Sequence, residues 1–446
     1  MAKKGIIIII LFFGFFTSKS QTLNYLSVDK QTYEKYLAQD WKGVIELGKE
    51  SKKAGIDFYY LNVRMGVAYF EQGKYLLSIL LLEKAIETNP DDEFVKLYLY
   101  YDYLYSGLEN QSLTVYSSMK PKTKNEIKIT SKKLKDLELS ISTSPNSSLL
   151  TLENTNYLEN DAIIAYSYIE KNTTNAQIGL NYQLKNNIFL FHDFSLLKSS
   201  YSFVKQSTIQ DNLLLDMSLT QLKYYGKFSI DLRKNFIFSA NYNLVAGYIQ
   251  DISEQLLYDG TTVNFGRWAS SGVVNVPFSQ LSMGISVSKQ FKILNIKPHI
   301  DLLKTYENLN IYSGLDLIIS PLANSDLYFK ISSSYNFLSE EDLPLVASGE
   351  AGFRLWKVYL YGFYYYGNIH NFVENDGYFL YNSSETQNNL FGGGITFPTK
   401  NKSFYISVNQ SNYDYTYTNV FSDQTEIQNT KSFTKLFFKG GIKWKF

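Results

Sequence analysis

The end of the chain, residues 435–446, carries the pattern that most constrains the fold. Two kinds of side chain alternate there one by one. One set comprises Leu436, Phe438, Gly440, Ile442, Trp444 and Phe446, and the other comprises Lys435, Phe437, Lys439, Gly441, Lys443 and Lys445. Successive side chains of a β-strand point to opposite faces, so this run predicts a strand with one apolar and one largely cationic face. Such a strand fits the wall of a membrane β-barrel. A soluble edge strand is the alternative, since it alternates in the same way.

The same residues form a second, shorter pattern. Lys439, Gly441, Trp444 and Phe446 stand at the spacing polar-x-Gly-x-x-aromatic-x-aromatic, with the last aromatic at the end of the sequence. This resembles the C-terminal β-signal that the outer-membrane insertion machinery reads. The resemblance implies that this machinery is a partner, and that the barrel lies in outer-membrane lipid.

Upstream segments repeat the alternation over 236–244, 281–287 and 327–335. Six short turns interrupt such segments, near Lys185–Asn187, Arg233–Lys234, Phe291–Leu294, Ala323–Asp326, Leu355–Lys357 and Thr399–Lys402. If both ends of the sheet lie on one side of the membrane, six turns on that side imply about 14 strands, with 12 or 16 as the neighbouring even counts.

Longer polar stretches are expected on the outer side, at 204–212, 250–278, 338–346, 369–388 and 418–431. We therefore expect an antiparallel barrel over 161–446, preceded by a Ser/Asn-rich linker over 142–160. Aromatic residues make up 16% of the chain, which fits the aromatic girdles of a barrel. A soluble β-sandwich is the alternative.

Residues 1–20 have the pattern of an export signal. Two lysines precede an apolar run over 5–16, and Ser18 and Ser20 place small residues where a signal peptidase cleaves. We expect cleavage before Gln21. A membrane-spanning helix needs about 20 apolar residues, which this run does not reach.

The apolar spacing over 21–141 is helical, so the chain is expected to be an α + β protein of two domains. The spacing is clearest in Tyr59–Pro90, where Gly66 and Ala85 allow two helices to approach closely. This segment resembles a tetratricopeptide repeat (TPR), which has a period of about 34 residues. Weaker flanking units and a Lys-rich capping helix over 121–141 would complete a periplasmic solenoid of about three repeats. A generic helical bundle is the alternative.

The TPR resemblance implies a binding groove rather than chemistry. The first helix of each repeat lines the concave face, so its exposed positions recur at steps of three and four. Those positions are Tyr60, Val63, Val67, Phe70, Phe94, Leu97, Tyr101 and Leu104. An apolar, aromatic lining suits a periplasmic peptide or a partner helix. Alternatively, some of these side chains pack against the neighbouring helix.

The sequence offers few groups for catalysis. It has no cysteine and three histidines, which excludes disulfides, thiolate metal sites and a cysteine nucleophile. Lys297, His299 and Asp301 share one face of a predicted strand, and we expect that face to be lumen wall. The sequence places no serine beside them. We therefore expect no enzyme, no metal site and no cofactor.

The expected lumen also includes Lys435, Lys439 and Lys443. Two interpretations stay open: a pathway biased toward anions or acidic polymers, and a wall in which these lysines are hydrated or ion-paired. The net charge of the chain is +1, which gives no reason to expect a nucleic-acid partner.

The combination of export signal, TPR-like segment and C-terminal barrel resembles three outer-membrane families. They are the polysaccharide-export porins, the surface lipoprotein assembly modulators and the YaiO-type barrels. The resemblance implies export or surface assembly of a polymer or protein, with the repeats recruiting cargo or a partner. The alternative is a passive porin or structural envelope barrel whose repeats dock to other envelope proteins.

Overall fold

The computed structural model describes residues 23–127, 133–146, 148–159, 161–209, 211–232, 234–252, 273–305, 308–338, 345–367, 369, 372–374, 379–381, 386–423 and 425–446. The expected export signal lies outside these residues. The chain divides into two compact units, Met1–Tyr98 and Leu99–Phe446.

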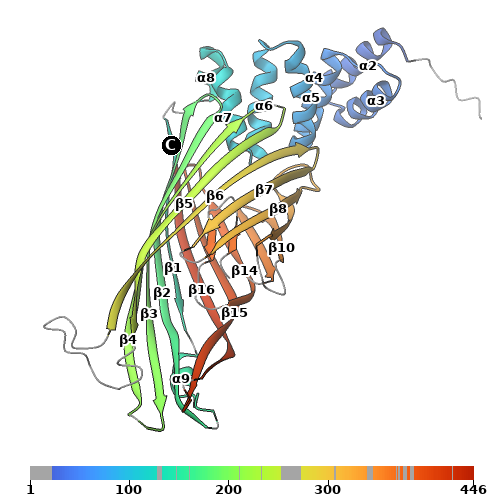
Figure 1. Ribbon diagram of the computed structural model, residues 1–446. Coiled ribbons are helices and arrows are strands. Elements are labelled where there is room, and N and C mark those ends of the chain that lie inside the picture. Colours follow the sequence, from blue (N-terminus) through green and yellow to red (C-terminus); the bar gives the residue numbers. More distant parts are fainter. Residues whose placement is uncertain are drawn as a thin grey trace, which may run out of the picture. The chain divides into compact units, whose positions relative to one another are not determined.

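The second unit contains a closed antiparallel barrel of fourteen strands among the described residues, drawn as arrows in Figure 1. The strands are β1 (Leu134–Pro145), β2 (Ala162–Lys185), β3 (Ile188–Ser207), β4 (Leu213–Asp231), β5 (Phe236–Ile252), β6 (Val273–Phe291), β7 (Leu294–Lys304), β8 (Leu309–Ile319), β9 (Leu327–Asn336), β10 (Leu345–Leu355), β11 (Val358–Tyr366), β14 (Thr386–Pro398), β15 (Lys402–Phe421) and β16 (Glu426–Lys445). The ring closes between β1 and β16, where Leu137 pairs with Trp444 and Ile141 with Gly440. The predicted barrel and its strand count are confirmed.

The six predicted short turns fall at connections between consecutive strands at one end of the barrel, and Arg233 of the second turn lies outside the described residues. This end also holds the start of β1 and the end of β16, because β1 and β16 pair there through Asp136 and Lys445. The connections at the other end include the segment between β1 and β2, with helix α9 (Leu149–Glu153), and the segment between β11 and β14, with the small hairpin of β12 (Phe372–Glu374) and β13 (Phe379–Tyr381).

The predicted start of the barrel is wrong. Residues 121–141 were expected to form a capping helix and 142–160 a linker, but β1 occupies Leu134–Pro145 and pairs on both edges, with β16 and with β2. The helix in this region is α8 (Pro121–Ile127). Lys, Glu and Leu favour helices in isolation, yet the open edges of β2 and β16 need a strand between them, and that pairing overrides local propensity.

The barrel wall has an apolar outer face and a polar inner face. Outward side chains such as Ile141, Ile285 and Ile331 are more than half exposed. Inward side chains on the same strands, such as Ser140, Ser286 and Ser332, are buried. Polar residues facing in and apolar residues facing out are the arrangement of a transmembrane barrel.

The first unit is made of helices α2 (Tyr25–Leu37), α3 (Trp41–Lys53), α4 (Tyr59–Glu71), α5 (Tyr75–Thr88) and the first part of α6 (Glu93–Tyr105). Val28, Val44 and Leu61 are fully buried in its core. Gly66 explains the close packing of α4 and α5, because a Cβ there would lie 2.4 Å from a methyl carbon of Leu82. The predicted helical hairpin over 59–90 corresponds to these two helices. Within the described residues, no helix is both long and apolar enough to cross a membrane.

Candidate functional site in the barrel lumen

Acidic and basic side chains meet in pairs across the inner wall. Lys435 on β16 is 1% exposed, and its Nζ lies 2.9 Å from a carboxylate oxygen of Glu170 on β2. Nζ of Lys297 on β7 lies 3.5 Å from a carboxylate oxygen of Asp316 on β8. These pairs place the predicted lumenal lysines on the inner face, each beside a carboxylate.

Nearer the end with the short turns, Lys443 on β16 lies 3.4 Å from Asp136 on β1, measured between Nζ and a carboxylate oxygen. Lys439 stands between Lys435 and Lys443 on the same face of β16, and its ammonium lies 5.9 Å from the centre of the Tyr405 ring. The lysine row is therefore held by neighbouring strands, which favours an ion-paired wall over a row of unneutralised cations.

A helix is bonded to the barrel at this same end. Helix α7 (Glu109–Ser118) belongs to the second unit and forms an ion pair between Glu109 and Lys445 at the end of β16. Gln183 Nε2 at the end of β2 donates to Ser117 Oγ at 3.2 Å. Burial alone would raise the pKa of Glu109, but the ammonium groups of Lys445 and Lys443 outweigh burial and lower this pKa. The carboxylate is thus charged at neutral pH and held to the barrel rim.

Next to this helix lies a polar cavity of about 310 Å³. Asn110 of α7 and seven side chains of the inner wall line it: Glu138, Asn181, Phe189, Phe191, Tyr225, Lys227 and Ser229. An α7 residue therefore forms part of the lining of the lumenal space at this end.

At the other end, part of the segment between β11 and β14 turns into the lumen. Ile369, Phe372 and Val373 are buried against the inward side chains Leu303 and Tyr312. The sequence placed 369–388 among the outer loops, and for these three residues that prediction is wrong. Their apolar side chains find buried partners inside the barrel, which outer solvent would not provide.

Next to this apolar cluster, a serine, a histidine and an aspartate of the inner wall lie close together. His299 Nδ1 lies 2.7 Å from Asp301 Oδ2 on the same strand, and His299 Nε2 lies 3.5 Å from Ser334 Oγ on β9. All three side chains are buried. The sequence paired His299 with Asp301 on one face but missed Ser334, since that contact depends on the register of three strands.

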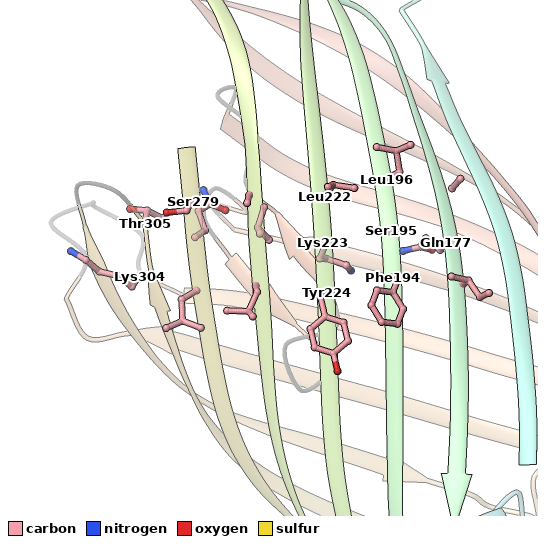
Figure 2. Close-up of a pocket in the computed structure, with 17 residues that line it drawn as sticks. Gln177, Phe194, Ser195, Leu196, Leu222, Lys223, Tyr224, Ser279, Lys304 and Thr305 are labelled. Carbon is pink, nitrogen blue, oxygen red and sulfur yellow. The ribbon is translucent and has the colours of Figure 1, made fainter. Parts of the chain in front are cut away.

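The outer wall carries a shallow apolar groove of about 1050 Å³ across β2 to β7. Figure 2 shows Phe194 on β3 beside Tyr224 on β4, with Leu196 and Leu222 further along the same strands. Phe194 is 47% exposed and Leu222 is 61% exposed, so these side chains lie on the outer face. In a bilayer this face contacts acyl chains, and the groove is therefore wall surface rather than a site for a water-soluble ligand.

The predicted groove residues of the helical segment divide into two groups. Tyr60 and Phe94 are 58% and 45% exposed. Val63 and Val67 are buried, so their assignment to an open groove is wrong and they belong to the core. Phe70, Leu97, Tyr101 and Leu104 are half-buried. Neighbouring helices pack against both sides of α4, so only part of the predicted groove face of this helix stays exposed.

The predicted insertion signal occupies the end of β16. Lys439 and Gly441 lie within the strand, Trp444 pairs with Leu137 on β1 and Lys402 on β15, and Phe446 is 39% exposed. The role of these residues in membrane insertion stays a prediction.

Comparisons with known proteins give only distant likenesses. No family model and no curated protein matches the chain. Among solved structures, the P. putida toluene transporter TodX has a TM-score of 0.43 at 9% identity, covering 71% of this chain and 91% of its own. A Pseudomonas aeruginosa FadL homologue has a TM-score of 0.42 at 8% identity, covering 75% and 92%. A bacterial polysaccharide outer membrane secretin has a TM-score of 0.34 at 11% identity, covering 70% and 99%. These likenesses are too distant to carry an argument, so the assignment as a barrel rests on the strand pairing itself.

Proposed function

We propose that the chain is an outer-membrane barrel that acts in export or surface assembly, with its helical part recruiting a periplasmic partner or cargo. The membrane location is supported by the closed sheet, which leaves no unpaired edge in lipid, and by the apolar outer face. The end with the short turns is then the periplasmic end, as in other barrels of this kind.

We propose further that the helices form a TPR-type array. Alternate helices begin at residues 25, 59 and 93, and the helices between them begin at 41, 75 and 109, a spacing of 34 residues in every case. This is the TPR period. The second residue of each first helix is Leu26, Tyr60 or Phe94, and these side chains are 76%, 58% and 45% exposed. An exposed apolar side chain at the same position of every repeat suits the binding of a peptide or a partner helix.

The observation that carries the proposed function is the bonding of α7 to the periplasmic rim. By its spacing α7 closes the third helical pair, and its Glu109 pairs with Lys445 of the barrel while Asn110 lines the lumenal cavity. A partner bound to the repeats would thus act on a helix that is attached to the entrance of the lumen.

Ionic current through the purified full chain in planar bilayers tests this role. Glu109→Gln removes the charge that holds Lys445, so we expect a several-fold rise in the fraction of time spent in a conducting state. Glu126→Gln on α8 is the matched control, because this exposed glutamate has no ion pair with the barrel in the described structure. Identical traces from the three proteins would contradict the role of α7.

Acid should reproduce the effect of the Glu109 substitution. A lowered folded-state pKa means that the carboxylate holds α7 at every pH above its ordinary value of 4.5, and that this contribution is lost as the pH falls through the lowered pKa. We therefore expect the current of the unsubstituted protein to rise only below pH 4.5, and that of Glu109→Gln to lack this rise.

A passive or structural barrel is the second candidate. The observation that favours it is the set of ion pairs across the inner wall, in particular the buried pair of Lys435 and Glu170. In that case neither the substitution at Glu109 nor acid would change the current, and a complete absence of current would identify a structural barrel.

A further inference from the structure

We propose that Ser334, His299 and Asp301 form a nucleophilic site in the lumen that hydrolyses small acyl esters. This activity goes beyond transport or assembly and does not depend on either. The site is built by strands β7, β8 and β9, and Tyr365 of β11 and Phe372 of the segment after β11 line the cavity beside it.

Strand register brings the serine to the histidine. His299 on β7 pairs with Gly314 on β8, and Gly314 pairs with Ser334 on β9. The middle position has no side chain, so the imidazole can reach across β8 to the hydroxyl. A Cβ at Gly314 would lie 2.2 Å from His299 Nε2 and 2.5 Å from Ser334 Oγ. Glycine is therefore required at this position for the contact to form.

A second glycine makes room for the aspartate. Gly284 on β6 pairs with Asp301, and a Cβ there would lie 2.0 Å from Asp301 Oδ1. Asp301 Oδ2 accepts from His299 Nδ1 at 2.7 Å, which fixes the tautomer with the proton on Nδ1. Nε2 is then an acceptor and faces the Ser334 hydroxyl at 3.5 Å. Contacts between nucleophile and base are often this long before substrate binds.

The cavity beside the three residues offers a donor for the substrate. Ser332 and Ser334 both line it, and the Ser332 hydroxyl is buried without a hydrogen-bond partner in the described structure. A hydroxyl of this kind can donate to the oxyanion that forms when a nucleophile attacks a carbonyl.

The cavity size defines the substrate class. Its free volume is about 10 Å³, close to the space that one water molecule needs. Phe372 forms part of the lining. An acyl group can enter only if the Phe372 side chain moves aside, so an ester with the smallest acyl group, acetyl, is the appropriate substrate and a long acyl chain has no room.

The reaction balances without a cofactor. Ser334 Oγ attacks the ester carbonyl carbon while its proton passes to His299 Nε2. The bond to the alcohol oxygen breaks, and the alcohol leaves with that proton. Water then attacks the acyl-serine and gives one proton to Nε2; acetic acid leaves with the other proton of the water, while the first proton returns to Ser334 Oγ. Asp301 is a positioning residue that holds the imidazole and stabilises its charged form.

The test uses the purified full chain with p-nitrophenyl acetate and, separately, with methanesulfonyl fluoride, a serine reagent about the size of an acetyl group, followed by mass spectrometry of the modified peptide. We expect modification at Ser334 and an ester-hydrolysis rate that falls to background in Ser334→Ala. The rate should fall at least about 100-fold in His299→Gln, the range for loss of a general base. Asp301→Asn should lower kcat and leave KM unchanged, because Asp301 positions the base and does not contact the substrate.

Ser286→Ala is the matched control, because Ser286 is a buried lumenal serine on the other side of His299, paired with it on β6. Phe372→Ala should open the cavity and extend the reaction to butyrate esters. The proposal holds if Ser334 is modified in the unsubstituted chain or in Phe372→Ala and the modification depends on His299. It is overturned if neither protein reacts at Ser334, or if Ser286→Ala removes the activity and Ser334→Ala does not. Heat-modifiable migration of each variant on gels shows that its barrel is folded.

Discussion

At the scale of single residues, Lys435 shows what alternation can and cannot predict. The alternation of side chains along a β-strand places the Lys435 side chain on the inner face, as predicted from the sequence. Its partner Glu170 lies 265 residues away in the chain, on a strand that reaches β16 only when the barrel closes. The Lys435 ammonium also lies 4.4 Å from the centre of the Tyr413 ring. The residues next to Lys435 in the sequence do not predict either contact.

Lys435→Met should destabilise the barrel strongly. The substitution leaves the Glu170 carboxylate buried without its cation, which costs about 3–5 kcal/mol. The measurement is the urea midpoint at which heat-modifiable migration is lost. Lys400→Met in an exposed turn is the control and should leave the midpoint unchanged. The double variant Lys435→Met with Glu170→Gln should recover part of the loss, since it removes the unpaired charge. Equal midpoints for Lys435→Met and the control would show that the ion pair is not needed.

At the scale of elements, β1 shows why a strand can be missed. Its residues alternate over Leu137–Ser142, but helix-favouring Lys, Glu and Leu dominate its first half. The turns were easier to recognise, because a short run of polar residues between two alternating segments is hard to interpret as anything but a turn. The pairing of both edges of β1 is a property of the closed sheet, which local sequence does not contain.

Ile141→Arg distinguishes the wall strand from the helix first expected there. Ile141 points outward from β1 and is 59% exposed. If the strand lies in lipid, arginine costs about 2–4 kcal/mol near the bilayer midplane, and the amount of barrel in outer-membrane fractions should fall. An arginine on an exposed periplasmic helix would be tolerated. Leu26→Arg on α2 is the control for an exposed leucine in water. Equal levels of both variants in the membrane would contradict the placement of β1 in the wall.

At the scale of the whole molecule, the count of short turns was enough to predict a closed ring of fourteen strands, because a membrane allows no open edge. The same reasoning could not predict how the far end is filled. Ile369, Phe372 and Val373 stand within a polar stretch and looked like outer loop, yet they pack inside. The contact of His299 with Ser334 was missed for a related reason, since it depends on three strand registers and on the missing side chain of Gly314.

The last prediction separates the two parts of the chain. Leu26, Tyr60 and Phe94 recur every 34 residues and are exposed in the first unit, so replacing them should remove partner binding without unfolding either part. Tyr60 also lies near Arg64, whose guanidinium is 5.6 Å from the centre of its ring and forms an ion pair with Asp29.

Tyr60→Ala combined with Phe94→Ala should abolish the export or assembly phenotype while barrel level and heat-modifiable migration stay normal. Val63→Ala is the contrasting variant: Val63 is buried, so its truncation should lower the melting temperature of the helical part. If the double variant melts like Val63→Ala, the two aromatic side chains belong to the core. If it folds normally and the phenotype is unchanged, the repeats do not bind their partner through this face. Loss of the phenotype with both parts folded would place recruitment on the helices and passage on the barrel.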